Sequence, residues 1–139
     1  MINYKTERDK QMNGKYIVVK ADGSIAIGAG EGKVTLAFMQ EKVGGLIERI
    51  PLPFETTIDL WCDEEGLFKD YKENEYVSDY LNHVWHRDNY YHYHIKGDVL
   101  ILGHDGENTV WLTDEEADKI LKSITGMGLV WYRCIENAK

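Results

Sequence analysis

The residues of this chain that could do chemistry are concentrated between Tyr76 and His94. Five tyrosines, one tryptophan and four of the five histidines of the chain stand in that tract. Aromatic rings can stack on the bases of nucleotides. Imidazoles change charge near neutral pH and bind metal ions. The tract therefore directs the search for function toward a ligand site or a metal site.

The metal alternative depends on five side chains at regular spacing. Asp79, His83 and His86 fall on the polar side of an expected helix, and His92 and His94 share one face of an expected strand. The side of the helix that contains Asp79, His83 and His86 is also the side opposite its apolar stripe, where polar residues are expected in any case. We therefore predict no metal ligand and no cofactor, and we keep a metal-dependent hydrolase as the least favoured alternative.

The ligand alternative uses the surplus rings of the tract, which are hard to bury in so small a domain. Stacking on a base contributes about 1 to 3 kcal/mol in single-stranded nucleic-acid sites. A nucleotide would also require cations for its phosphates. The predicted ligand-binding residues are Tyr90, Tyr91, His92, Tyr93, His94 and Trp85 for the base, and Arg49, Lys33, Arg87 and Lys96 for the phosphates.

A glycine-rich segment, residues 28–35, is similar to a phosphate-binding loop but departs from its pattern. Only three residues separate Gly28 from the Gly32-Lys33 pair, where the motif has four, and Val34 replaces the Ser or Thr that follows the lysine. The segment is predicted to be a flexible loop. Its backbone amides, Lys33 and a helix start capped by Thr35 could still bind one anionic group.

Charge along the chain is strongly uneven. The net charge is -8, and residues 55–118 contain seventeen acidic and four basic residues. Such a segment repels nucleic-acid phosphates, which are bound by clustered Lys and Arg. It could instead attract a basic protein surface. The alternative interface consists of acidic residues 63–75 and 105–118 with an aromatic anchor, centred on Asp63, Glu64 and Glu65.

Hydrophobic periodicity predicts one α+β domain, residues 14–139, after a flexible segment at residues 1–13. The Asp22-Gly23 turn joins strands at 15–20 and 24–27, and a further strand is expected at 90–95. The expected helices are 35–43, ended by Gly44-Gly45, 77–86 in the aromatic and histidine-rich segment 76–96, and 113–124, which opens on a capping box. The sheet is expected to be mainly antiparallel with about six to seven strands, including 46–52, 57–62, 98–103, 109–112 and 129–135.

Neither an apolar run long enough to cross a bilayer nor a signal peptide occurs in this sequence. The expected location is therefore the cytoplasm. Cys62 and Cys134 stand in apolar strand-like runs outside any zinc-binding spacing, so both are predicted to be buried thiols.

Several short motifs resemble a small family catalogued as domain of unknown function 3846. They are Met39-Gln40, the runs 43–48 and 50–53, the acidic turn 62–66, the strand 97–101 and the helix start 112–115. The likeness spans about residues 36–121. It implies a shared fold, no catalytic residues, and a phage or prophage accessory protein that acts inside a bacterial host cell.

These observations together predict a non-enzymatic counter-defence protein of phages or prophages. It would bind and sequester a nucleotide-derived small molecule, such as a host immune signal. The alternative is an acidic inhibitor or adaptor that docks on a host defence or nucleic-acid-handling protein. An aromatic surface is also compatible with a homo-oligomer.

Overall fold

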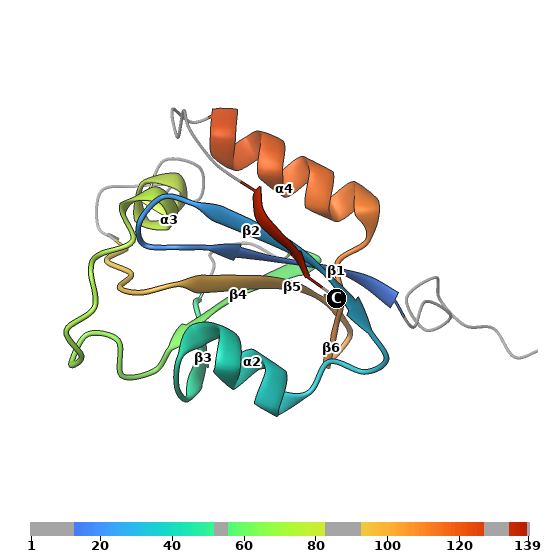
Figure 1. Cartoon of the computed structure of the whole chain (residues 1–139), viewed down its shortest axis with the longest axis horizontal. Coiled ribbons are helices and arrows are strands. Elements are labelled where there is room, and N and C mark those ends of the chain that lie inside the picture. Colours follow the sequence, from blue (N-terminus) through green and yellow to red (C-terminus); the bar gives the residue numbers. More distant parts are fainter. Residues whose placement is uncertain (1–12, 52–55, 83–92, 127–133, 139) are drawn as a thin grey trace, which may run out of the picture.

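The computed structural model describes residues 13–51, 56–82, 93–126 and 134–138. They form one sheet with helices on both of its faces (Figure 1). The strands are β1 (Asn13–Val19), β2 (Ile25–Glu31), β3 (Ile47–Arg49), β4 (Ile58–Asp63), β5 (Val99–Asp105), β6 (Asn108–Val110) and β7 (Cys134–Ala138). The helices are α2 (Leu36–Val43), α3 (Glu75–Tyr80) and α4 (Asp114–Gly126). The predicted α+β class is confirmed.

Neighbouring strands follow the order β3-β4-β5-β1-β2-β7, and β6 pairs with β5. All pairs are antiparallel except β2 with β7. The central strands β1 and β5 are buried on both sides, as the continuous apolar run of residues 99–102 requires. The sheet therefore has a core on each face.

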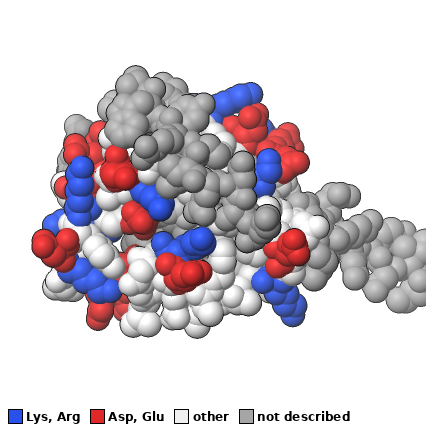
Figure 2. All heavy atoms as spheres, viewed as in Figure 1, with Lys and Arg blue, Asp and Glu red and all other residues white. Residues whose placement is uncertain are grey.

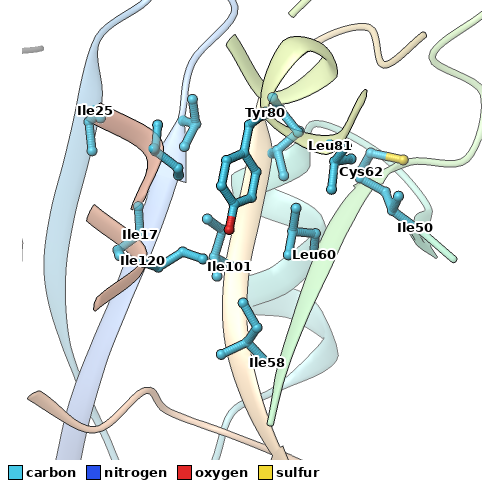
Figure 3. Packing of buried hydrophobic residues seen from close by; sticks show 14 of the residues in the cluster. Ile17, Ile25, Ile50, Ile58, Leu60, Cys62, Tyr80, Leu81, Ile101 and Ile120 are labelled. Carbon is cyan, nitrogen blue, oxygen red and sulfur yellow. The ribbon is translucent and has the colours of Figure 1, made fainter. Parts of the chain in front are cut away.

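The two cores are separated by the alternation of side chains along each strand. Ile17, Leu60 and Ile101 point to the face covered by α3 and α4, where Figure 3 shows them packed with Tyr80 and Leu81. The opposite core lies under α2 and is built from Tyr16, Val18, Ala26, Met39, Val43, Leu100, Leu102 and Trp111. Along each strand, the side chains between those of the first core therefore face α2.

Local signals in the sequence predicted the turns and caps correctly. Gly23 has a φ of 94° in the β1–β2 turn. Thr35 Oγ1 accepts from Phe38 N at 3.1 Å, and Gly44 ends α2 in the left-handed conformation. The capping box of α4 is present, because Thr113 N donates to Glu116 Oε1 at 3.0 Å and Glu116 N donates to Thr113 Oγ1 at 3.1 Å.

The prediction of a loop over residues 28–35 is wrong for residues 28–31, which belong to β2, and correct for residues 32–35, which lie between β2 and α2. The glycines leave room for aromatic rings that lie flat against the strand. A Cβ atom at Gly28 would stand 2.2 Å from Tyr16 Cζ, and one at Gly30 would stand 2.5 Å from the Trp111 ring. These two glycines therefore serve packing.

The expected helix 77–86 and strand 90–95 differ from the structure where it describes them. Helix α3 ends at Tyr80, with π-type hydrogen bonding at residues 81 and 82. Residues 93–95 are not a strand, because side chains from α3 and the turn after it take their backbone groups. Asn82 bonds both the N–H and the carbonyl of Tyr93, and Ser78 Oγ accepts from Ile95 N.

Strands β3, β7 and β1 have other bounds than expected. Strand β3 is shorter than the predicted 46–52, and β7 begins at Cys134, where the predicted strand 129–135 was ending. Strand β1 begins at Asn13, inside the segment expected to be flexible.

Across the described ranges, no helix has the length and apolar character needed to cross a membrane.

Candidate functional site

The predicted ligand tract falls largely on residues that the structure does not describe. Trp85, Arg87, Tyr90, Tyr91 and His92 lie outside the described residues. Their proposed part in binding a base or a phosphate stays a prediction.

Tyr93 and His94, the described residues of that tract, have different surroundings. Tyr93 is a core residue with 6% of its surface exposed, and its hydroxyl donates to the Pro51 carbonyl at 2.7 Å. Its expected role as a stacking platform is corrected, because the ring is packed in the interior. His94 is exposed, with Nδ1 3.6 Å from Glu73 Oε2.

Lys33 and Lys96, two of the described cations of the predicted phosphate site, do not converge. Lys33 follows the end of β2 that pairs with Asn13, at the start of β1. Lys96 precedes Val99, which pairs with Val19 at the other end of β1. Seven residues of strand separate these ends, a span of about 20 Å at about 3.3 Å per residue. Lys33 and Lys96 therefore cannot bind the same phosphate.

Within the described ranges, no three His, Cys, Asp or Glu side chains come close enough to hold a metal ion. Asp79 is exposed on α3. Three of its expected partners, His83, His86 and His92, lie outside the described residues.

A different site emerges in the segment between β4 and α3. We call residues 63–70 the acidic loop. Asp63 is buried at its start, where its Oδ2 accepts from Lys69 Nζ at 2.7 Å and from the Tyr71 hydroxyl at 2.8 Å. Its Oδ1 accepts from Glu65 N at 2.9 Å. One carboxylate thus ties together both ends of the acidic loop.

The acidic loop is also held against the end of α2. Lys69 Nζ lies 3.4 Å from the Gly44 carbonyl. A Cβ atom at Gly45 would stand 2.6 Å from Asp63 Oδ2, and one at Gly97 would stand 2.9 Å from the Tyr71 ring. The small residues at 45 and 97 therefore permit the close approach that positions the loop.

Charge pairing determines the ionisation of this network. Burial alone would raise the pKa of Asp63, but the bonds from Lys69, Glu65 N and Tyr71 outweigh it and lower that pKa below 3.8. The bond to Asp63 raises the pKa values of Lys69 and Tyr71. At neutral pH the network is a carboxylate between an ammonium and a phenol.

The acidic loop presents apolar side chains to solvent. Phe68 is 89% exposed and Leu67 is 65% exposed, next to the exposed carboxylates of Glu64 and Glu65. Leu46, also exposed, lies beside the loop because its carbonyl accepts from Glu64 N at 2.7 Å. On the face drawn in Figure 2, the acidic and basic side chains of the described residues are interspersed with one another.

The structure corrects one part of the predicted protein interface. Glu64 and Glu65 are available to a partner, whereas Asp63 is internal and fully paired. The charge of Asp63 therefore serves the shape of the loop and cannot contact a docked surface.

A shallow cleft of about 260 Å³ lies beside Tyr71, between the end of α2 and the turn before β5. Two acids and two bases surround it. Its lining residues are Ala21, Glu41, Lys42, Val43, Gly44, Tyr71, Lys72, Gly97 and Asp98. This mixture of charges does not select an anionic ligand.

Sequence reasoning missed Phe68, Lys69 and Tyr71. A signal existed, because Leu67-Phe68 is an apolar pair inside an acidic turn, where turn residues are usually polar. It also missed that Asp59 and His104 meet. An aspartate within the apolar strand run 58–62 was the available signal there.

The fold and this site define a small α+β domain with an anchored acidic loop. The chain belongs to the family described as Domain of unknown function (DUF3846), whose match covers residues 12–125. Neither a curated protein nor a solved structure matches the chain.

Proposed function

We propose that this protein is a non-enzymatic docking protein that binds a basic protein surface through the acidic loop. Phe68 enters an apolar pocket of the partner, and Glu64 and Glu65 contact the basic rim of that pocket. The observation that carries the proposal is the 89% exposure of Phe68 on a loop anchored by a buried carboxylate.

The exposed aromatic residue is suited to be an interface anchor. Aromatic residues are enriched in the centres of interfaces and among the residues whose truncation weakens binding most. Because Asp63 and Lys69 already order the loop, association loses less conformational entropy than it would with a flexible loop. The anchor is therefore displayed in a form prepared for binding.

Charge supports a basic partner. Residues 63–75 contain six acidic and two basic residues. Complementary charge speeds encounter and suppresses binding to acidic surfaces. We therefore expect affinity to fall as salt concentration rises, since exposed charges are screened.

The family resemblance adds the biological setting to the proposal. Phage or prophage accessory proteins act on the machinery of a bacterial host, so the proposed partner is a host defence or nucleic-acid-handling protein. Both kinds of protein present basic surfaces where they bind nucleic acid. The protein would then act as a counter-defence inhibitor or adaptor.

Sequestration of a nucleotide-derived molecule has less support from the described residues. Tyr93 is buried, and Lys33 and Lys96 lie at opposite ends of β1. That prediction now depends on residues 83–92, outside the described ranges. Calorimetry against cyclic nucleotides and ADP-ribose derivatives tests it, and absence of heat with every compound would exclude it.

The docking proposal is tested by affinity capture from a bacterial lysate with matched variants. We expect Phe68→Ala and the double variant Glu64→Lys/Glu65→Lys to lose a protein that the unmodified chain retains at low salt. Leu36→Ala and Glu31→Lys are the controls, because they change an exposed leucine at the start of α2 and an exposed acid at the end of β2. Equal capture by all variants, or no capture, would reject the proposal.

A further inference from the structure

Strand β3 leaves one of its two edges unpaired. It ends the strand order on its side of the sheet, and β4 is its partner among the described strands. Just before β3, the Leu46 carbonyl accepts from Glu64 N at 2.7 Å. Just after β3, Ile50 N donates to the Leu60 carbonyl at 2.8 Å. The backbone groups of residues 46 and 50 therefore bond toward β4.

The direction of hydrogen bonding alternates along an antiparallel strand, and this decides where the groups of β3 point. Leu46, Glu48 and Ile50 direct their backbone groups toward β4. Ile47 and Arg49 stand between them in the register, so their N–H and carbonyl groups point away from β4. No hydrogen bond from the described residues reaches these outward groups. The edge thus offers two donor-acceptor pairs, about 7 Å apart along the strand.

The free edge of β3 is accessible to another chain. Glu48 and Arg49 are exposed, and Ile47 is half-buried. Leu46, which precedes the strand, is 53% exposed. An extended segment that adds to such an edge forms main-chain hydrogen bonds, and the side chains beside it select its sequence. The side chains of β3 therefore indicate what kind of segment fits.

A second copy of this chain is a poor occupant of the edge. Two antiparallel β3 strands use all of their outward groups when Ile47 of each copy lies opposite Arg49 of the other. This register places the two Glu48 residues directly opposite one another, in a non-hydrogen-bonded pair, where side chains are closest. Like charges at such positions are destabilising. Short, charged edge strands are a common means of avoiding pairing between copies.

The same glutamate favours a basic residue in a partner strand. Opposite charges on directly opposed residues stabilise a pair of strands. The acidic loop adds to this preference, because the exposed Glu64 lies opposite Leu46 and continues the β3–β4 register by one position. Arg49 does not oppose it, since side chains alternate along a strand and that of Arg49 points to the other face of the sheet.

We propose that β3 is a strand-addition site for an extended segment of a partner protein, with a lysine or arginine of that segment opposite Glu48. The segment runs antiparallel to β3, because antiparallel pairing is slightly more stable per residue than parallel pairing. The residues on either side of its basic residue exchange hydrogen bonds with Ile47 and Arg49. None of these contacts involves Phe68, so the site is independent of the docking proposal.

The test uses the full chain and two capped seven-residue peptides. Both peptides alternate valine with threonine, except for a central lysine in one and a central glutamate in the other. NMR titration measures their affinities and the hydrogen exchange of the backbone amides. We expect the lysine peptide to bind saturably, several-fold more tightly than the glutamate peptide, and to slow exchange at Ile47 and Arg49. The Glu48 amide, which faces β4, is the internal reference.

Matched variants separate strand pairing from general attraction between charges. Glu48→Lys should reverse the preference, because the glutamate peptide then meets a lysine. Glu31→Lys makes the same change of charge at an exposed position at the end of β2, and it should keep the preference of the unmodified chain. A lysine peptide methylated on the two backbone nitrogens that flank the lysine side keeps its charge but loses the donors for the Ile47 and Arg49 carbonyls, so it should bind much more weakly.

Three results would overturn the proposal. They are the absence of saturable binding, binding that leaves exchange at Ile47 and Arg49 unchanged, and an unchanged peptide preference in Glu48→Lys. Because Glu48 is exposed, this variant should keep the fold of the unmodified chain, and its NMR spectrum checks that directly.

Discussion

Lys69 Nζ lies 2.7 Å from the buried Asp63 Oδ2, and this ion pair closes the acidic loop onto the end of α2. The carboxylate belongs to β4, whereas the ammonium comes from the opposite end of the loop. The position of Phe68 on the surface therefore depends on the ion pair between Asp63 and Lys69, in which Phe68 takes no part.

Removing the charge of Asp63 should destabilise the fold. Asp63→Asn removes the charge that pairs with Lys69 and leaves one acceptor oxygen in place of two, so either Lys69 and Tyr71 or Glu65 N lose their acceptor. Loss of one partner of a buried hydrogen bond costs about 1 to 3 kcal/mol. Urea denaturation measures the loss of unfolding free energy. Glu64→Gln is the control, because an exposed neighbour should change stability by no more than about 0.5 kcal/mol.

The stability of the unmodified chain relative to Asp63→Asn should depend on pH. The pKa of Asp63 in the folded state lies below its ordinary value of 3.8. Its ionised form therefore stabilises the fold above pH 3.8, and this contribution disappears as the pH falls through the lower folded-state pKa. The stability difference between the unmodified chain and Asp63→Asn should be largest near neutral pH and shrink in acid. A stability difference that is the same at neutral and at acidic pH would contradict the role given to this carboxylate.

A methyl group at position 28 should be poorly tolerated. In Gly28→Ala the new Cβ atom would overlap the Tyr16 ring, and overpacking of this kind costs about 1 to 3 kcal/mol. Ala29→Ser, at the exposed neighbouring position of β2, is the matched control. Thermal unfolding of the two variants decides the matter, since a flexible glycine loop would tolerate both changes equally.

Asn74 should be one of the most sensitive polar residues. It is fully buried, its Nδ2 donates to the carbonyls of Val19 and Gly97 at 2.9 Å each, and its Oδ1 caps α3 through Val77 N. Loss of a cap alone costs about 1 kcal/mol, and the two orphaned carbonyls add to that.

Denaturation of Asn74→Ala and Asn74→Asp separates these two functions. Asn74→Asp keeps the capping oxygen but loses both donors, so we expect it to be destabilised as well. An aspartate variant as stable as the original would show that only the cap matters.

The Cys62 thiol should be unreactive in the folded protein. Burial, together with Glu48 and Asp63, raises the pKa of Cys62 to about 11. The thiolate, which is the reactive form, is therefore scarce near neutral pH. In a Cys134→Ser background, alkylation by iodoacetamide at about pH 8 should be slow for the folded chain and fast in denaturant. Similar rates in both conditions would show that Cys62 is accessible.

The sequence predicted those features that depend on neighbouring residues. Asp22-Gly23, Thr35 with Gly44, and Thr113 with Glu116 act within one turn, and all three formed as expected. Their energetics are local, so no knowledge of the sheet was needed.

Features that depend on strand register could not be predicted in this way. The role of Gly28 requires knowing that Tyr16 lies opposite it, and the contact of Asp59 with His104 requires the pairing of β4 with β5. Tyr93 was expected to be surplus because its strand-like pattern hid the hydrogen bonds that Asn82 makes to its backbone. The most exposed aromatic side chain of the acidic loop is Phe68, which lies outside the tract richest in rings.

The most direct test of the docking account is site-specific photo-crosslinking from position 68 in a bacterial lysate. A photoreactive phenylalanine analogue there should join to one protein, and the product should decrease with added salt and with an excess of the unmodified chain. The same analogue at position 36, an exposed leucine away from the loop, should not form that product. Absence of a crosslink at position 68, or an identical product from position 36, would contradict the account.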